Sequence, residues 1–523
     1  MVAAIPDVRS PYDAMKVLDR IALHPILFAA YAILFVYAAN LDEVLPIDAQ
    51  APLGRAILGA LIALVVCSLL LRDRRRGAIV ASALVVAFYA YGHVSGGLSS
   101  LGADRRIQLA GWAVLVIVAL VYAIRARASL PSVTRGLNVL SLVLVLIAAW
   151  SIVPYEANRF SRGPILARSA IAADATGAAS GQKRDIYFLV FDRYGSAEAL
   201  ERRFGITDND LYDWLRQRGF QVPAHPHANY RATDFSLAAT LNMEFLDHLT
   251  EAIGPVSGDR TPAAAMFKDH AVGRFLKAQG YAYEQLGSWF QQTRAISIAD
   301  ENRVLGSTSE FESVVDRTTI VPAIRQQLGH RDPKLTFRDY HREATLFEFR
   351  ELRRISTAPG PKFVFAHILL PHDPYVFHAD GSPLSEAEAD ATPEAELYAN
   401  HLAVANAQIK EIVGYLQAGP EATRPIIIIE SDEGPLNCQS VDCVSNTPDY
   451  LRIRLGNLIA MDLPGVTEQL PDDYTPVNTF RTVFRHYFGA DLPDLPNRSF
   501  TWPDNDHIYA FEDVTDKIAG PRP

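Results

Sequence analysis

The stretch that decides the fold of the main domain is RPIIIIESDEGPLNC, residues 424–438. Four consecutive isoleucines end in Glu430, Ser431, Asp432 and Glu433, and a glycine follows. A short β-branched apolar run that stops at a turn signal predicts a strand buried on both faces. Because ligands of open α/β sheets lie beyond the carboxyl ends of such strands, these carboxylates mark a candidate site.

Two further stretches have the same form. RDIYFLVFDRYGS, residues 184–196, runs apolar from Ile186 to Phe191 and ends in Asp192. KFVFAHILL, residues 362–370, is a third buried-type strand, and His372 and Asp373 follow it. One strand-end Asp alone favours a solvated turn, since Asp is a common turn residue. Several such ends in one chain favour a shared site.

Helical segments alternate with these strands. TPEAELYANHLAVANAQIKEIVGYLQ, residues 392–417, begins with a threonine and a proline and carries an apolar stripe at helical spacing. Alternation of strands and helices predicts an α/β domain with a mainly parallel central sheet. Residues 184–523 are numerous enough to bury a large core.

The first 155 residues have a different character. Uncharged apolar stretches recur there at about 21–41, 55–72, 77–95, 107–125 and 136–155. A bilayer span needs about 20 mostly apolar residues, so five transmembrane helices are predicted rather than buried core helices. The first stretch is not a cleavable signal peptide, because it is long and no small-residue cleavage site follows it. Residues 156–183, rich in Ala, Gly and Ser, are predicted to be a linker.

Arginines in the connecting loops predict the orientation. Four lie between the second and third spans (Arg72, Arg74, Arg75, Arg76) and three between the fourth and fifth (Arg125, Arg127, Arg135). The positive-inside rule makes these loops cytoplasmic; Arg105 and Arg106 are the only contrary pair. We therefore expect a multi-pass protein of the cytoplasmic (inner) membrane whose C-terminal domain is extracytoplasmic, or periplasmic.

Charge and cysteine content fit export. Of 49 Lys+Arg and 59 Asp+Glu, 36 and 51 lie after residue 155, a net charge of −15 for that part. An acidic domain argues against nucleic acid as a partner. Cys438 and Cys443, five positions apart, predict a small disulfide loop in an exported domain; the alternative, half of a zinc site, lacks a second cysteine pair.

A hydroxyl adds to the candidate site. Thr233 and Ser236, in ANYRATDFSLAATLNMEFL (residues 228–246), precede a helical apolar pattern. A hydroxyl at this position is most often a helix cap. The same position suits a nucleophile, because helix N-terminal amides favour an incoming anion.

These motifs, in this order and with YTPVNTFRTVFRHYFG (residues 474–489), resemble the sulfatase-like branch of the alkaline phosphatase superfamily. That superfamily includes sulfatases, lipoteichoic acid synthases and phosphoethanolamine transferases. The resemblance covers roughly residues 184–500. It implies an alkaline-phosphatase-like sandwich, and the family's membrane-anchored transferases also carry about five spans. No Cys-x-Pro-x-Arg motif is present, which argues against a formylglycine sulfatase.

The resemblance also implies roles for individual residues. The first-strand metal ligand falls on Asp192, the nucleophile on Thr233, and the substrate-side histidine on His372. The Asp-His metal pair falls on Asp432 and Glu433, so a glutamate replaces the usual histidine. A turn histidine is the alternative for His372.

This replacement leaves two functions open. Asp192, Thr233, Asp432 and Glu433 would offer only oxygen ligands, which favour one Mn²⁺ or Mg²⁺, with Ca²⁺ an option and Zn²⁺ disfavoured. The protein would then be a hydrolase or transferase acting on a phosphate or sulfate ester of a membrane lipid or envelope glycan through Thr233. Alternatively, the site is degenerate and the domain binds a lipid or glycan, or acts as an envelope scaffold.

Overall fold

The computed structural model describes residues 22–100, 104–125, 130–166, 183–306, 309–327, 337–436 and 446–519. The chain divides into two compact units. The first contains residues 1–161 together with 308–331, and the second contains residues 162–307 together with 332–523. Each unit is described by itself.

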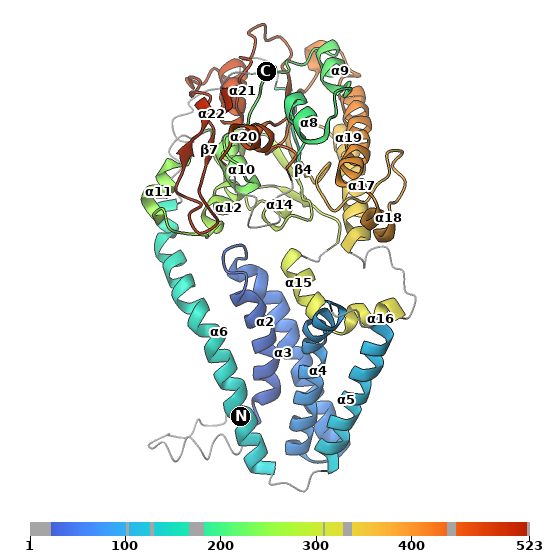
Figure 1. Ribbon diagram of the computed structural model, residues 1–523. Helices are drawn as coiled ribbons and strands as arrows, with labels where there is room; N and C mark the ends of the chain where they lie inside the picture. Colours follow the sequence, from blue (N-terminus) through green and yellow to red (C-terminus); the bar gives the residue numbers. More distant parts are fainter. Residues whose placement is uncertain are drawn as a thin grey trace. The chain divides into compact units, whose positions relative to one another are not determined.

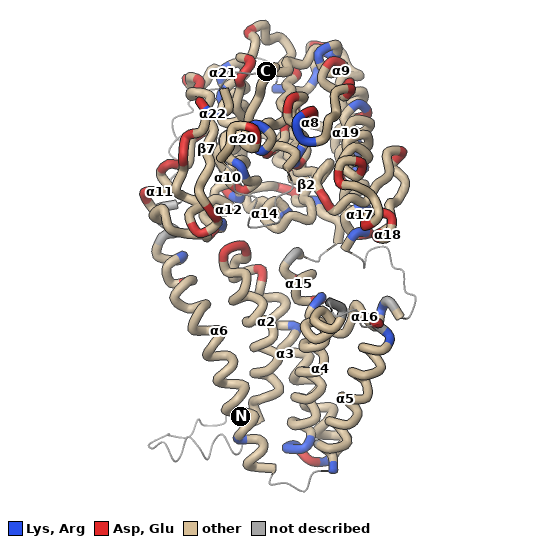
Figure 2. The backbone as a smooth tube through the Cα atoms, in the orientation of Figure 1, with Lys and Arg blue, Asp and Glu red and all other residues tan. Residues whose placement is uncertain are grey.

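The first unit is helical. Its N-terminal helices are α2 (His24–Ala38), α3 (Pro46–Leu71), α4 (Arg74–Ser100), α5 (Arg105–Arg125) and α6 (Leu130–Leu166). Three of them are long and apolar enough to cross a membrane, over Pro46–Leu71, Arg74–Leu98 and Leu130–Ser161. The apolar parts of α2 and α5 are shorter. Charged residues gather toward helix ends and leave most of each helix uncharged (Figure 2).

Helix α6 continues beyond the predicted fifth span. It runs to Leu166, so residues 156–166 of the predicted linker are helical. The helix is stabilised there by the i,i+3 ion pair of Arg159 with Glu156, and Tyr37 of α2 donates a 2.6 Å hydrogen bond to the same carboxylate. Residues 167–182 lie outside the described residues.

A short segment from the middle of the chain joins this unit. It comprises α15 (Glu310–Thr318) and α16 (Val321–Gln327), and Ser309 caps α15 by accepting a hydrogen bond from the Glu312 amide. Phe311 and Val315 are buried in one apolar cluster with residues of α2, α3 and α4. The predicted division of the chain placed this segment in the outer domain, because its amphipathic pattern does not indicate which surface it covers.

The second unit is built on a six-stranded sheet with the order β3-β2-β4-β1-β5-β6. The strands are β1 (Ile186–Phe191), β2 (Ala282–Leu286), β3 (Glu301–Arg303), β4 (Lys362–Ile368), β5 (Ile426–Glu430) and β6 (Ile459–Asp462). All neighbours pair in parallel except β5 and β6. The expected mainly parallel sheet is therefore present. A separate antiparallel pair joins β7 (Phe500–Thr501) to β8 (Glu512–Asp513).

Helices cover both faces of the sheet (Figure 1). Ile186, Phe188 and Val190 of β1 face a core shared with α10 (Thr233–Asn242), α11 (Asp247–Ile253), α12 (Thr261–Lys268), α13 (Ala271–Ala278) and α21 (Thr479–Phe488). Alternate residues of β1 face the second core, with α8 (Ala197–Phe204), α9 (Leu211–Gln217), α17 (Phe337–Ser356) and α19 (Glu394–Leu416). The near-continuous apolar runs of β1 and β5 follow from burial on both faces.

Shorter elements complete this unit. They are α14 (Gln291–Arg294), α18 (Glu386–Ala391), η1 (Glu421–Thr423), α20 (Pro448–Leu455), η3 (Pro476–Asn478) and α22 (Thr515–Ala519).

Candidate metal centre

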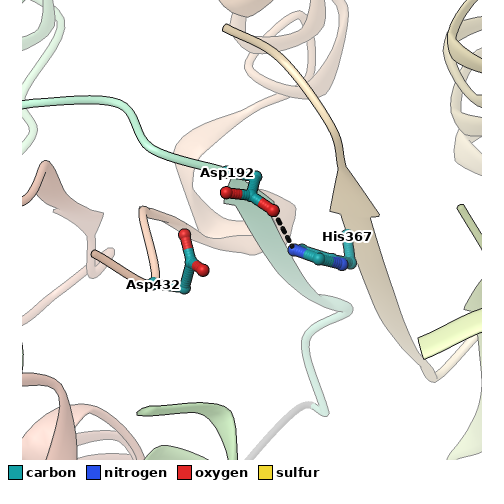
Figure 3. Close-up of side chains that lie close together, drawn as sticks. All are labelled: Asp192, His367 and Asp432. Atoms are coloured by element: carbon teal, nitrogen blue, oxygen red, sulfur yellow. Dashed lines mark ion pairs between the residues drawn. The ribbon is translucent and has the colours of Figure 1, made fainter. Parts of the chain in front are cut away.

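Three buried side chains meet where neighbouring strands end. Asp192 follows β1 directly, Asp432 lies two residues beyond β5, and His367 is the second-last residue of β4. β1 lies between the other two strands, and Val190 pairs with both His367 and Glu430. The three strand ends are therefore level, and Figure 3 shows the side chains of Asp192, His367 and Asp432 close together.

The distances fit a metal ion. One ligand atom from each of Asp192, His367 and Asp432 lies within 4.8 Å of the others. His367 Nε2 is 3.3 Å from Asp192 Oδ2. All three side chains are buried, so their charges are poorly screened by water.

Thr233 extends this group. Its hydroxyl donates a 2.6 Å hydrogen bond to Asp432 Oδ2, across 199 positions of sequence. Thr233 is the first residue of α10, and the cap residue is Ala232, which makes no side-chain capping bond. Capping, the usual role of a threonine at this position, is therefore not the role of Thr233. Its side chain is only partly buried.

Thr293 orients His367. The Thr293 hydroxyl lies 2.8 Å from His367 Nδ1 and 3.5 Å from the Phe290 carbonyl oxygen. With a metal ion bound, the Thr293 hydroxyl would accept the Nδ1 proton and donate to Phe290, which would leave Nε2 unprotonated toward the ion. Such an outer partner is what metal-binding histidines commonly have.

The burial and negative charge of Asp192 and Asp432 favour a bound cation. Burial and the charges of Asp192 and Glu433 raise the pKa of Asp432 well above its ordinary value. Burial opposes ionisation of Asp192 too, but without a metal ion the interactions with His372, His367, which also hydrogen-bonds to it, and Arg193 lower the pKa of that carboxyl. Asp192 Oδ1 is buried and accepts no hydrogen bond from the described residues. These carboxylates and the imidazole fit a divalent metal ion.

The three carboxylates that follow the isoleucines of residues 424–438 have different partners. Glu430 turns to α21, where the Thr479 hydroxyl donates to it, and burial raises the pKa of Glu430 to about 8. Glu433 is held by Arg193 and Arg454, with N···O distances of 3.1 and 2.7 Å. Only Asp432 belongs to the buried Asp-His-Asp group. A ligand role for Glu433 stays a prediction, and its ion pairs favour another role.

His372 lies on the loop after β4. Its Nδ1 contacts the carbonyl oxygen of Asp373 and is 3.4 Å from the Asp373 carboxylate. The side chain is 24% exposed, so a substrate has access to it. The role in proton transfer expected for His372 stays a prediction. Cys438 and Cys443 lie outside the described residues.

Sequence reasoning missed His367 and Arg193. The oxygen-only ligand set does not describe the group that the structure brings together, because an imidazole joins it. One signal was available, since His367 interrupts the apolar run FVFAHILL at alternate spacing from Phe363 and Phe365. Those two residues face the core that contains α10, so His367 points to the face of the sheet that carries Thr233.

No protein-family model matches the chain, and no curated protein matches it. Among solved structures, it is similar to the C-terminal periplasmic domain of EptC from Escherichia coli, with 11% identity and a TM-score of 0.39 over 65% of this chain and 94% of that one. It is also similar to the integral membrane protein lipooligosaccharide phosphoethanolamine transferase A from Neisseria meningitidis, with 13% identity and a TM-score of 0.35 over 95% and 98%.

A third likeness is to a protein in the alkaline phosphatase superfamily from Vibrio parahaemolyticus, with 11% identity and a TM-score of 0.37 over 64% of this chain and 80% of that one. This is the superfamily that the sequence motifs resemble. At such TM-scores these likenesses are distant.

Proposed function

We propose that this protein is a membrane-anchored, metal-dependent enzyme that hydrolyses or transfers a phosphate or sulfate ester, with Thr233 as nucleophile. The observation that carries the proposal is the hydrogen bond from Thr233 to Asp432 within a buried Asp-His-Asp group at three strand ends. A threonine hydroxyl is a weak nucleophile unless a base or a metal ion activates it.

The proposed setting is the cytoplasmic membrane, crossed five times, with the α/β domain on the extracytoplasmic side. The three long apolar helices and the loop arginines support this topology. A membrane anchor favours a lipid or envelope glycan as substrate, and the acidic domain disfavours nucleic acid.

The proposed chemistry has two steps. The Thr233 oxygen forms a bond to phosphorus or sulfur while the bond to the leaving oxygen breaks, and the hydroxyl proton leaves along the hydrogen bond to Asp432. His372 gives a proton to the leaving alcohol. Water or a second alcohol then gives its proton to His372 and attacks the phospho- or sulfo-threonine, and the released Thr233 oxygen takes back the proton held by Asp432.

A divalent ion held by Asp192, His367 and Asp432 would lower the pKa of the Thr233 hydroxyl and offset the charge of the ester. Because His367 adds an imidazole to the donors, the reason for ranking Zn²⁺ below Mn²⁺ and Mg²⁺ disappears. Zn²⁺ and Mn²⁺ are the ions that we expect to bind.

The test uses the full-length protein in detergent, with p-nitrophenyl phosphate, p-nitrophenyl sulfate and vesicles of bacterial membrane lipid as separate substrates. Thr233→Ala should lower turnover on the order of 10³-fold or more. Thr240→Ala is the matched control, because the Thr240 hydroxyl on the same helix donates to the Ser236 carbonyl instead. Chelation should abolish turnover, and added Zn²⁺ or Mn²⁺ should restore it.

Peptide mass spectrometry after rapid quenching should find the adduct on Thr233. Full turnover by Thr233→Ala would exclude this nucleophile. A wild-type protein that binds lipid vesicles, contains no metal and turns over none of the three substrates would favour the binding or scaffold function instead.

A further inference from the structure

Arg193 has an unusual backbone. It follows Asp192 directly and has a φ of +59°, in the left-handed region that non-glycine residues seldom adopt. Its amide donates a 3.1 Å hydrogen bond to Asp432 Oδ1, and its carbonyl oxygen accepts a 2.8 Å hydrogen bond from the Tyr398 hydroxyl. Strained residues of this kind persist where the surroundings determine them, often at functional sites.

The Arg193 side chain joins two loops. Its Nε donates to Glu433 Oε1 at 3.1 Å, and its Nη1 donates to Asp373 Oδ1 at 3.0 Å. With its amide on Asp432, this single residue links the ends of β1, β4 and β5. A planar guanidinium with donors in a fixed fork suits this bridging, whereas a lysine ammonium does not reproduce it.

A second guanidinium completes the surroundings of Glu433. Arg454 Nη2 lies 2.7 Å from Glu433 Oε2. Carbonyl oxygens of Arg231 and Leu436 hold Arg454, at 2.6–3.0 Å. Each oxygen of the Glu433 carboxylate, which is 2% exposed, thus faces one arginine.

The charges balance with a single metal ion. The carboxylates that lie in this group are Asp192, Asp373, Asp432 and Glu433, whereas Glu430 at the end of β5 turns away to Thr479 of α21. Arg193 and Arg454 supply two positive charges, and one divalent ion supplies the other two. Buried carboxylates that lack a cation are costly, so removal of an arginine should leave a place for another positive ion.

We propose that Arg193 is the built-in second cation of the site, so that the protein binds one divalent metal ion on Asp192, His367 and Asp432, while Glu433 holds the two arginines and is not a metal ligand. The inference rests on the proposed function for the existence of the metal site. Arg193 is a positioning residue, since it acts through the carboxylates that it holds.

The test counts metal ions. Full-length protein in detergent is loaded with Zn²⁺ or Mn²⁺, passed through gel filtration and measured by inductively coupled plasma mass spectrometry, with affinity from titration calorimetry. Wild type should hold one ion per chain, and Asp432→Asn should lose it. Glu433→Gln should keep one ion with an affinity within a few-fold of wild type, whereas loss of a true ligand would cost at least about tenfold.

Arg193→Ala should bind a second, weaker ion between Glu433 and Asp373, because each carboxylate loses its ion pair with Arg193. Arg202→Ala is the matched control and should bind one, because Arg202 pairs with Glu198 and Asp449 on α8 and at the start of α20, away from the strand ends. If Arg193→Ala does not fold, the double variant Arg193→Gln, Glu433→Gln removes both charges together and should bind one ion.

Two ions in wild type, a tenfold loss of affinity in Glu433→Gln, or no second ion in a folded Arg193→Ala would each overturn the inference and leave the proposed function standing. A wild-type protein that binds no ion would overturn both.

Discussion

At the scale of single residues, burial decides which polar groups have a special environment. Thr233 and Asp432 are joined by one hydrogen bond between residues distant in sequence. His270 shows the same principle away from the site, because it is fully buried as the cap residue of α13. Its Nδ1 accepts a 3.0 Å hydrogen bond from the Gly273 amide, and its Nε2 lies 2.8 Å from the Tyr283 hydroxyl.

We predict that His270 makes the α/β domain sensitive to acid. Burial, with the charge of Arg274, lowers the pKa of His270 to about 3. Between that value and about 6.5 the unfolded chain binds the proton and the folded one does not, so stability is lost as the pH falls through this window. The loss is on the order of 1.4 kcal/mol per pH unit.

His270→Asn should keep a good cap and remove this titration. Melting temperatures of the full-length protein at pH 7 and pH 5 should therefore differ less for His270→Asn than for wild type. His507→Asn, at a histidine whose side chain is 38% exposed, is the control and should behave as wild type. An equal shift for His270→Asn and wild type would contradict the prediction.

At the scale of elements, α15 and α16 depend on a close approach to α4. The Ile320 amide donates a 3.0 Å hydrogen bond to the Phe88 carbonyl oxygen of α4. A Cβ on Gly92 would lie 2.7 Å from Thr318 Cα and closer still to the Arg317 carbonyl oxygen. Glycine is needed at this position because the main chain of α4 contacts the main chain at the end of α15 there.

We predict that Gly92→Val detaches this segment from the first unit. The side chain would clash with main-chain atoms that cannot rotate away, and the burial of Phe311 would be lost with the contact. Limited trypsin digestion in detergent should cut faster after Arg317 and Arg325 in this variant. Gly96→Val, one turn further along α4 with no atom within 4 Å of its Cβ, should digest as wild type. Equal digestion of both variants would refute the contact.

At the scale of the whole molecule, the contacts of α15 relate the directions of the first unit's helices. Its Phe311 packs on Tyr37 near the end of α2, with ring centroids 6.3 Å apart, and Glu312 pairs with Arg55 in the first half of α3. The later half of α4 meets the same segment at Gly92. Helices α2, α3 and α4 therefore present their end, start and end to one segment, so successive helices run in opposite directions.

We predict that this end of the helices is extracytoplasmic. A reporter enzyme that works only after export should be active when fused after residue 44 or residue 183, and inactive after residue 73, where the arginines gather. Activity after residue 73 combined with inactivity after residue 183 would reverse the orientation. Activity at all three positions would rule out crossing by α3.

The sequence by itself determined strands β1, β4 and β5, the long apolar helices of the N-terminal part and the acidic strand ends. Long β-branched or apolar runs admit few alternatives, because burial on two faces or in a bilayer is their only favourable environment. For that reason Asp192 and Asp432 could be placed at one edge of a parallel sheet, and Thr233 at a helix start, before any contact was known.

Only the tertiary structure decided which side chains meet. His367 joins the site because β4 pairs with β1 and the second-last residue of β4 faces α10. Glu433 does not belong to the group because it forms ion pairs with Arg193 and Arg454, which are 240 and 21 positions away in the sequence. The insertion of α15 and α16 among the N-terminal helices likewise depends on the bare backbone of Gly92. The local sequence pattern does not indicate such contacts. The order of the strands, and the surface that each helix covers, are set by packing between segments far apart in the chain.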